Sequence, residues 1–303
     1  MSVLTLGETM ALFDPSANGP PSLGMSYTLR FGGAESNLAI GLARLGVAVR
    51  WISRVGDDPI GTLITETLAA EGVDVAFVVR EPGAPTGAFM KIRNQGRTRV
   101  QYFRRGSAAS HLKIGDLPDL ALEGIKIVHL TGITLALSES AARLVIDTAR
   151  RARDRGIMVT FDPNYRPALW PNAEAARRAE EPLLEWVDWY LCGEDEARTL
   201  WGSGAPEALD ARIRSAGAGN VAIRLGERGA FVAGGVVPPP NLVTVADEVG
   251  AGDGFGAGFV YGLLQGFPPD VCARCGHLIA SYALRGTGDW ETLPRLSDVA
   301  GLL

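Results

Sequence analysis

Short apolar runs and amphipathic segments alternate along most of the chain. Apolar runs of strand length occur at residues 3–6, 47–53, 125–130, 157–162, 189–192 and 221–225. Segments with helical periodicity lie between them, for example at residues 60–70 and 138–153. This pattern is typical of a mostly parallel sheet flanked by helices on both faces. The sequence therefore predicts an α/β fold whose ligands bind at the carboxyl ends of the strands.

Two segments break this alternation. Residues 10–31 are rich in Pro and Gly and have strand-like ends, and residues 87–105 have the pattern of a hairpin around a turn at 94–96. Neither contains the helix that a parallel crossover usually requires. We expect the two segments to form one small antiparallel sheet over the ligand-binding edge of the main sheet. Because no linker or internal repeat is visible, we expect a single domain over residues 1–303.

Composition narrows the function classes. The 303 residues are 47% hydrophobic, enough for one large core or two modest ones. The net charge of −5 is spread over interspersed acids and bases, so we expect no nucleic-acid partner. No apolar run reaches membrane-spanning length, and the start of the chain has the pattern of a buried strand rather than a signal peptide. Three cysteines suit a reducing compartment, so we expect a cytoplasmic protein with no membrane partner.

The cysteines and histidines do not indicate a metal site. Cys272 and Cys275 lie one turn apart on a predicted helix over residues 269–284. Zinc would need a second pair of ligands, and His277 alone does not supply one. We therefore expect the two thiols to pack in the interior. His129 ends a strand-like run, and we expect it to be structural.

A run of small residues, Gly250, Ala251 and Gly252, directly precedes a predicted helix over residues 253–265. Amide groups at a helix N-terminus are unpaired, and the helix dipole is positive there, so such a turn can bind a phosphate or a developing oxyanion. Asp253 stands beside this turn. A carboxylate there is suited to take a proton from a hydroxyl that attacks a phosphate. The motif alone leaves a second possibility open, that Asp253 caps the helix.

A second glycine turn lies near the N-terminus. Gly32 and Gly33 follow a strand-like run, let a ligand approach the backbone, and precede a helix that carries Asn37. This motif and the later Asp247-x-x-Gly-Ala-Gly-Asp253 motif together resemble the two signatures of the ribokinase-like (PfkB) carbohydrate kinases, over residues 4–289. The resemblance implies the ribokinase-like fold with a small β-sheet lid. It also implies transfer of a phosphoryl group from ATP, with Mg²⁺, to a sugar hydroxyl, and it allows a homo-oligomer formed through the lid.

Within that family, the chain is most similar to the 2-keto-3-deoxygluconate kinases. Tyr102 and Arg104 share one strand face by the alternation of side chains, and residues 102–110 resemble the segment that contacts sugar and carboxylate in those kinases. Phe89 stands where they carry a phenol, so the ring is kept and a hydroxyl contact is lost. The resemblance implies substrate contacts by Gly32, Gly33, Asn37, Phe89, Tyr102, Arg104, Ile133, Arg166 and Asp289.

Arg166 lies in a proline-rich loop directly after a predicted strand. Its guanidinium can form two parallel hydrogen bonds to a carboxylate or phosphate, although a pair with Asp162 is an alternative. Glu35 stands where fructokinases usually carry proline, and two arginines facing one site suit an acidic sugar. We therefore expect phosphorylation of the primary hydroxyl of 2-keto-3-deoxygluconate.

Other functions remain as alternatives at this point. The chain could be a fructokinase or another sugar or nucleoside kinase of the family. A non-catalytic sugar-binding homologue is disfavoured because a sensor needs no base at Asp253. A dinucleotide oxidoreductase is disfavoured because no Gly-x-Gly-x-x-Gly motif follows the first strand.

The expected nucleotide side departs from the family pattern at two positions. Residues 224–229 resemble a Lys-x-Gly-x-x-Gly motif in which Arg224 replaces lysine, and residues 193–196 resemble an Asn-x-x-Glu motif in which Gly193 replaces asparagine. Glu194 and Glu196 could equally stabilise a helix N-terminus. The resemblance implies ATP contacts by Arg224, Gly226, Gly229, Gly250 and Gly252, Mg²⁺ held through water by Glu196, and a monovalent cation near Asp247.

Overall fold

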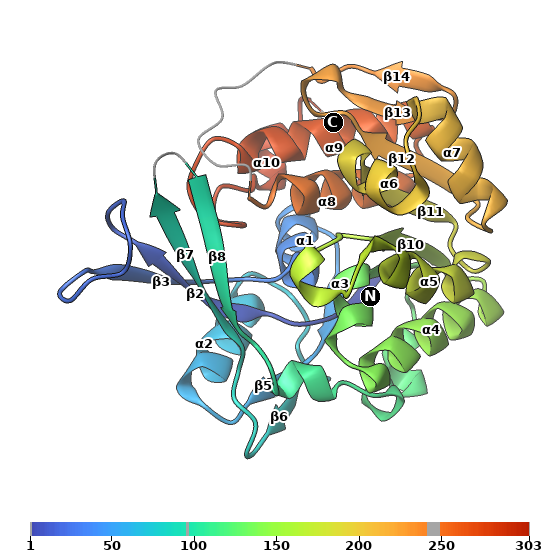
Figure 1. Cartoon of the computed structure of the whole chain (residues 1–303). Helices are drawn as coiled ribbons and strands as arrows, with labels where there is room; N and C mark the ends of the chain where they lie inside the picture. Colours follow the sequence, from blue (N-terminus) through green and yellow to red (C-terminus); the bar gives the residue numbers. More distant parts are fainter. Residues whose placement is uncertain (1, 95–96, 241–248, 303) are drawn as a thin grey trace.

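The computed structural model describes residues 2–94, 97–240 and 249–302. Its main sheet has eight strands in these residues, in the order β14-β13-β12-β11-β10-β9-β1-β4 (Figure 1). Six of these strands, β12, β11, β10, β9, β1 and β4, are parallel, as predicted. Strands β13 and β14 add an antiparallel edge. Their bounds are β1 (Val3–Leu6), β4 (Val49–Ile52), β9 (Ile127–Thr131), β10 (Met158–Asp162), β11 (Trp189–Gly193), β12 (Asn220–Arg224), β13 (Ala230–Val232) and β14 (Gly235–Val237).

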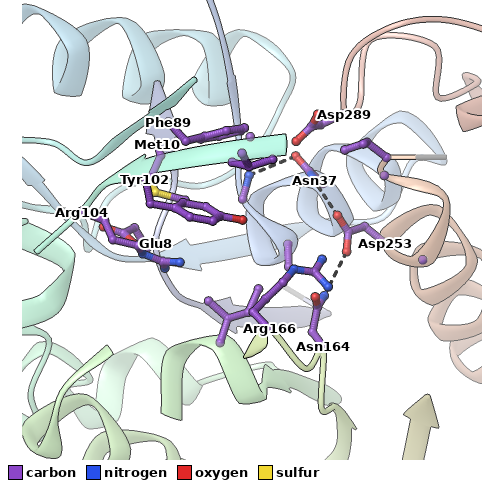
Figure 2. A pocket seen from close by; sticks show the side chains of 18 of the residues that line it. Glu8, Met10, Asn37, Phe89, Tyr102, Arg104, Asn164, Arg166, Asp253 and Asp289 are labelled. Carbon is purple, nitrogen blue, oxygen red and sulfur yellow. Dashed lines mark hydrogen bonds and ion pairs between the residues drawn. The ribbon is translucent and has the colours of Figure 1, made fainter. Parts of the chain in front are cut away.

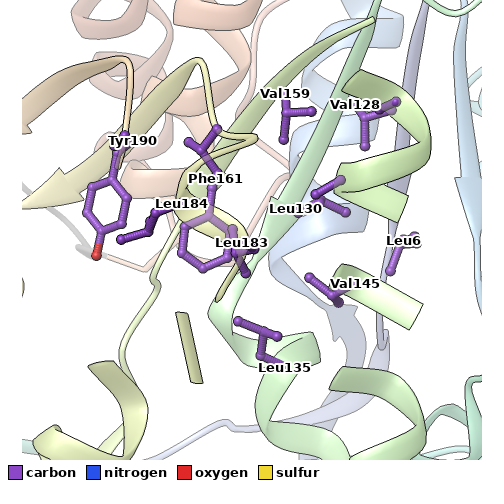
Figure 3. Close-up of a cluster of buried hydrophobic side chains, with 14 of the residues drawn as sticks. Leu6, Val128, Leu130, Leu135, Val145, Val159, Phe161, Leu183, Leu184 and Tyr190 are labelled. Carbon is purple, nitrogen blue, oxygen red and sulfur yellow. The ribbon is translucent and has the colours of Figure 1, made fainter. Parts of the chain in front are cut away.

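Helices cover both faces of this sheet. One face packs against α3 to α7 through an apolar cluster in which Leu130, Val145 and Phe161 are fully buried (Figure 3). The other face packs against α1, α2, α8 and α9. The bounds are α1 (Ala34–Arg44), α2 (Pro59–Ala70), α3 (Gly132–Leu137), α4 (Glu139–Asp154), α5 (Ala173–Leu184), α6 (Glu194–Trp201), α7 (Pro206–Ser215), α8 (Ala251–Leu264), α9 (Pro269–Ala283) and α10 (Leu296–Val299). This arrangement confirms the predicted α/β class.

Helix α4 shows how the sequence specifies these elements. Ser138 caps its N-terminus by accepting a hydrogen bond from the amide of Ala141 at 3.1 Å. Leu144, Val145 and Thr148 are buried at helical spacing, while charged side chains occupy the solvent face. The helix therefore packs its apolar face against strands β9 and β10.

The two segments that break the alternation form a second sheet, the lid sheet, in the order β3-β2-β7-β8. Its strands are β2 (Met10–Pro15), β3 (Tyr27–Gly32), β7 (Ala88–Asn94) and β8 (Arg97–Phe103), and it projects from the body of the molecule (Figure 1). The prediction that it is wholly antiparallel is wrong, because β2 and β7 are parallel. The chain between them passes through α1, α2, β4 and the small sheet of β5 (Arg54–Gly56) and β6 (Val79–Glu81), which is long enough to return it in the same direction.

The prediction that the two cysteines pack in the interior is confirmed. Cys272 and Cys275 are buried and free on α9, against glycines of α8, and burial raises the pKa of the Cys272 thiol to about 12. His129 is buried, lies 2.9 Å from the Thr160 hydroxyl, and has its pKa lowered to about 4 by burial. None of the described helices combines the length and apolarity that crossing a bilayer requires.

Candidate active site

A pocket of about 520 Å³ lies between the carboxyl ends of the main-sheet strands and the lid sheet (Figure 2). It brings together residues from both halves of the chain, including most of those named from sequence. The predicted residues in its lining are Gly32, Gly33, Asn37, Phe89, Tyr102, Arg104, Ile133, Arg166, Glu196, Arg224, Gly250, Gly252, Asp253 and Asp289. Ala251, Gly226 and Gly229 lie outside the lining, and Asp247 falls outside the described residues.

The N-terminus of α8 opens into this pocket. The helix begins at Ala251, two residues earlier than predicted, and Gly250 is its N-cap residue. Gly250 has φ of 81°, and a Cβ there would lie 2.0 Å from the carbonyl oxygen of Asp289, so only glycine fits. The first intrahelical bond runs from Gly254 to Gly250, so the preceding amides have no partner within the helix. These amides form a candidate anion site, and the guanidinium carbon of Arg224 lies 3.8 Å from the Cβ position of Gly252.

Asp253 lies in the first turn of α8, so the alternative that it is the N-cap residue is wrong. Asn37 donates a hydrogen bond of 2.7 Å to one carboxylate oxygen, and the Asn164 amide lies 3.5 Å from the other. Burial raises the pKa of Asp253 to about 7, aided by the negative charges of Asp162 and Asp289. The Asn37 hydrogen bond and the positive charge of Arg166 oppose this rise. The carboxyl is therefore poised to accept a proton near neutral pH.

Arg166 is exposed and points toward the pocket from the loop after β10 (Figure 2). Its guanidinium forms no hydrogen bond or ion pair within the part of the chain that the structure describes, while its backbone carbonyl accepts from the amide of Leu169. The alternative pairing with Asp162 is wrong, because Asp162 accepts 2.8 Å from Arg224 and 2.9 Å from the amide of Asn164. The Arg166 guanidinium is thus available to a ligand.

On the lid side, the rings of Phe89 and Tyr102 lie 6.0 Å apart, and Arg104 stands 5.6 Å from the centre of the Tyr102 ring. Arg104 already has a partner. Its Nε and a terminal nitrogen lie 2.7 and 2.5 Å from one oxygen of Glu8, a buried residue that the sequence reasoning missed. The sequence position of Glu8 could have identified it, because a charged residue just after the buried strand β1 lies at the ligand-binding edge of the sheet.

Asp289 contacts the lid sheet from the loop after α9. Lys91 of β7, also missed, is almost fully buried, and its ammonium lies 3.3 Å from Asp289. Arg44 holds the loop by donating hydrogen bonds to the carbonyls of Trp290, Glu291 and Leu293. Strand alternation could have identified Lys91, because it shares the inward face with Phe89.

Asn164 is a third residue that the sequence reasoning missed. It lines the pocket, and its φ of 40° is unusual for a residue with a side chain. Its backbone amide donates a hydrogen bond of 2.9 Å to the Asp162 carboxylate, which shapes the turn that presents Arg166. Such strained positions cluster at functional sites, but no sequence pattern marks them.

On the expected nucleotide side, Arg224 lies between two carboxylates, 2.8 Å from Asp162 and 3.3 Å from Glu196. Glu196 also accepts hydrogen bonds from the amides of Gly193 and Tyr165. Burial, and then the charge of Asp162, raise the pKa of Glu196. Glu196 thus caps the N-terminus of α6, as the helix interpretation predicted, and it also lines the pocket, while its role toward Mg²⁺ stays a prediction.

These contacts define how the site could hold Mg²⁺. Both oxygens of Glu196 are engaged by amides, and the described residues contain no cluster of three or more His, Cys, Asp or Glu side chains able to hold a metal. The donor set therefore fits a hydrated ion reached through water rather than a protein cage. Gly226 and Gly229 shape the turn between β12 and β13, where a Cβ at Gly229 would lie 2.1 Å from a carbonyl oxygen.

Glu35, which distinguished acidic from neutral sugars in the sequence comparison, does not line the pocket. Its buried carboxyl accepts hydrogen bonds of 2.5 and 2.6 Å from Thr131 and Thr134, and burial raises its pKa. Glu35 therefore links α1 to β9 and α3 and lies outside the pocket lining.

Comparisons with known proteins agree with this geometry. Residues 1–296 match the model of the pfkB family of carbohydrate kinases. The chain is 35% identical to a 2-dehydro-3-deoxygluconokinase of Bacillus subtilis (strain 168), over 100% of the chain and 95% of the relative. The crystal structure of a PfkB protein from Polaromonas sp. JS666 superposes with a TM-score of 0.90 at 36% identity, covering 99% of both chains.

A second solved structure is a putative ribokinase II from E. coli in complex with ATP and Mg²⁺. It superposes with a TM-score of 0.89 at 25% identity, covering 99% of this chain and 98% of the other. The fold, the match over nearly the full length, and a carboxyl in the first turn of a helix that opens into the pocket all lead to one conclusion. The chain belongs to the pfkB family of carbohydrate kinases and is a sugar kinase.

Proposed function

We propose that this kinase transfers the γ-phosphoryl group of ATP to the primary hydroxyl of 2-keto-3-deoxygluconate. The observation that carries the proposal is which of the Lys and Arg side chains lining the pocket form ion pairs with carboxylates. Lys91, Arg104 and Arg224 each lie beside a carboxylate, whereas Arg166 is the cation of the described lining without an ion pair. A guanidinium facing a sugar site binds a carboxylate with two parallel hydrogen bonds. The relative from Bacillus subtilis, named a 2-dehydro-3-deoxygluconokinase, supports the same substrate.

The residues around Asp253 supply the chemistry. Asn37 fixes the carboxylate through its 2.7 Å hydrogen bond, so Asp253 is oriented to take the proton of the attacking hydroxyl. The first-turn amides of α8 and the Arg224 guanidinium face the place where negative charge develops on the transferred group. Mg²⁺, when bound, neutralises phosphate charge and is reached through water from Glu196.

The lid sheet supplies the walls of the sugar side. Phe89, Tyr102 and Val100 contribute apolar surface to the pocket, and Met10 comes from the adjacent strand. Apolar walls exclude water, which would otherwise compete with the sugar for the phosphoryl group. The lid therefore protects the transfer as well as binding the sugar.

The direct test is a linked ADP-release assay with Mg-ATP and a panel of 2-keto-3-deoxygluconate, gluconate, fructose and ribose. We expect kcat/KM for 2-keto-3-deoxygluconate to exceed that for fructose on the order of 10²-fold or more, because a neutral sugar leaves Arg166 without a partner. Fructose is the second candidate, because Glu8 neutralises Arg104 and because Phe89 stands where the acid-sugar kinases carry a phenol. A specificity constant that favours fructose would overturn the acid-sugar assignment and leave the kinase assignment intact.

We further propose that two copies associate through the outer face of the lid sheet. On that face Phe13 pairs with Leu29 and Met90, and Leu29 and Phe103 are 46% and 57% exposed. Exposed apolar side chains on one sheet face are typical of an interface between copies. Sedimentation of the protein and of L29E/F103E tests this, and a wild-type monomer at micromolar concentration contradicts it.

The free, buried cysteines are consistent with a cytoplasmic protein.

A further inference from the structure

Glu8 occupies the short connection between β1 of the main sheet and β2 of the lid sheet. Its side chain is 0% exposed, yet the residue lines the sugar side of the pocket. Two nitrogens of Arg104 contact one carboxylate oxygen at 2.7 and 2.5 Å, and the Ser107 hydroxyl donates to the other at 2.5 Å. Both oxygens of Glu8 are therefore occupied by groups from the segment that follows β8, and Figure 2 shows Glu8 and Arg104 side by side.

Neighbouring glycines make room for this arrangement. A Cβ at Gly87 would lie 2.7 Å from a carboxylate oxygen of Glu8, and a Cβ at Gly33 would lie 2.2 Å from its backbone carbonyl. The carboxylate is thus enclosed by backbone on one side and by Arg104 on the other. A buried ion pair with this geometry holds its guanidinium in one orientation.

The pair also changes the charge that the pocket offers to a sugar. Arg104 lies beside Tyr102 on the lid side, where its positive charge would otherwise add to that of Arg166. Glu8 cancels it at contact distance. Of the other cations in the lining, Lys91 is paired with Asp289, and Arg224 is paired with Asp162 and Glu196.

We propose that Glu8 determines the charge specificity of the sugar site by orienting and neutralising Arg104. Among the described lining residues, the site then offers a sugar one guanidinium without an ion pair, that of Arg166. It accepts one carboxylate and discriminates against a terminal phosphate, which carries about two charges. Glu8 acts through Arg104 and is a positioning residue. This inference rests on the proposed function, because it concerns the same sugar site.

The test uses three competitors of equal chain length with a free primary hydroxyl at one end: sorbitol, gluconate and sorbitol 6-phosphate. Their other end carries no charge, one charge and about two charges. Dissociation constants are measured by calorimetry with the intact protein. Wild type should bind gluconate most tightly. In Glu8→Gln the uncancelled Arg104 should tighten sorbitol 6-phosphate relative to sorbitol on the order of tenfold.

Removing the freed cation should reverse the effect. The double variant E8Q/R104M should restore the wild-type ratios, and Arg104→Met alone should weaken gluconate relative to sorbitol on the order of tenfold, because Glu8 is then uncancelled. Glu81→Gln is the matched control. It removes a carboxylate from the Arg54 ion pair outside the pocket and should leave all three ratios unchanged.

The outcomes separate the two proposals. If Glu8→Gln weakens all three competitors equally, its role is structural and the inference is wrong. Unchanged ratios in that variant also overturn it. If Glu8→Gln does not fold, the comparison of R104M with E8Q/R104M decides, and equal ratios in those two variants contradict the inference. A wild-type enzyme that phosphorylates no sugar acid refutes the proposed function alone, because the binding ratios still measure the effect of Glu8.

Discussion

Replacing Asp253 with asparagine should lower activity and raise stability at the same time. The carboxyl has a pKa of about 7 in the folded protein against the ordinary 3.8. Because the folded-state value is the higher one, its contribution to stability is fully present below pH 3.8 and is lost as the pH rises through about 7. At pH 8 the folded protein must hold this carboxylate ionised among Asp162 and Asp289, and asparagine removes that cost.

The magnitude follows from the same values. For a fully enclosed group, the difference between the two pKa values lowers the free energy of unfolding by about 4 kcal/mol at pH 8. Asp253 is partly exposed toward the pocket, so water screens part of this electrostatic cost. We therefore expect Asp253→Asn to raise the free energy of unfolding by about 2 kcal/mol at pH 8. The stability difference in favour of Asp253→Asn over wild type should grow from pH 5 to pH 8. Loss of the base should lower kcat about 10²- to 10⁴-fold.

Urea denaturation at pH 5 and pH 8 measures the stability difference, and the ADP-release assay measures kcat. The wild-type profile of kcat/KM should show an acid limb with a midpoint near pH 7. Asp195→Asn, which removes an exposed charge on α6, is the control. A variant that retains more than about half of wild-type kcat would remove Asp253 from the role of base. A stability difference that does not change with pH would refute the burial argument.

Two further changes test other parts of the site. Arg166→Ala should raise the KM for the sugar acid far more than that for ATP, by the equivalent of about 2–5 kcal/mol, and equal effects on both substrates in initial-rate kinetics would instead indicate a structural role. Gly250→Ala should lower both kcat and thermal stability, because its Cβ would lie 2.0 Å from the carbonyl of Asp289. Gly234→Ala is its matched control: φ is again 81° but nothing lies within 4 Å, so equal losses in the two variants would show that backbone strain rather than the clash is responsible.

The fold could be predicted from the sequence because its signals are local. Buried parallel strands give continuous apolar runs, and α4 has both a cap and a periodic apolar face. The parallel pairing of β2 and β7 could not be predicted, because it depends on where a long connection returns the chain. Most of the candidate site was likewise accessible through two glycine motifs and a proline-rich loop.

The residues that were missed have roles that depend on tertiary structure. Glu8 and Lys91 are buried charges whose roles depend on partners distant in sequence, Arg104 and Asp289. Asn164 depends on a backbone conformation that no side-chain pattern announces. The sequence shows which charges exist, but which of them cancel one another is decided by the packing of the lid sheet against the body.

The order in which the chain supplies the pocket has a consequence for its synthesis. Glu8 and Asn37 leave the ribosome before Asp253 and Asp289, because they precede them by more than 200 residues. Strand β1 lies between β4 and β9, so the sheet can begin to assemble during translation. The loop that Arg44 and Lys91 hold arrives only afterwards. A nascent chain can therefore acquire much of its sheet while its catalytic centre is still incomplete, and a product that ends before Asp289 would be an inactive protein with a largely formed body.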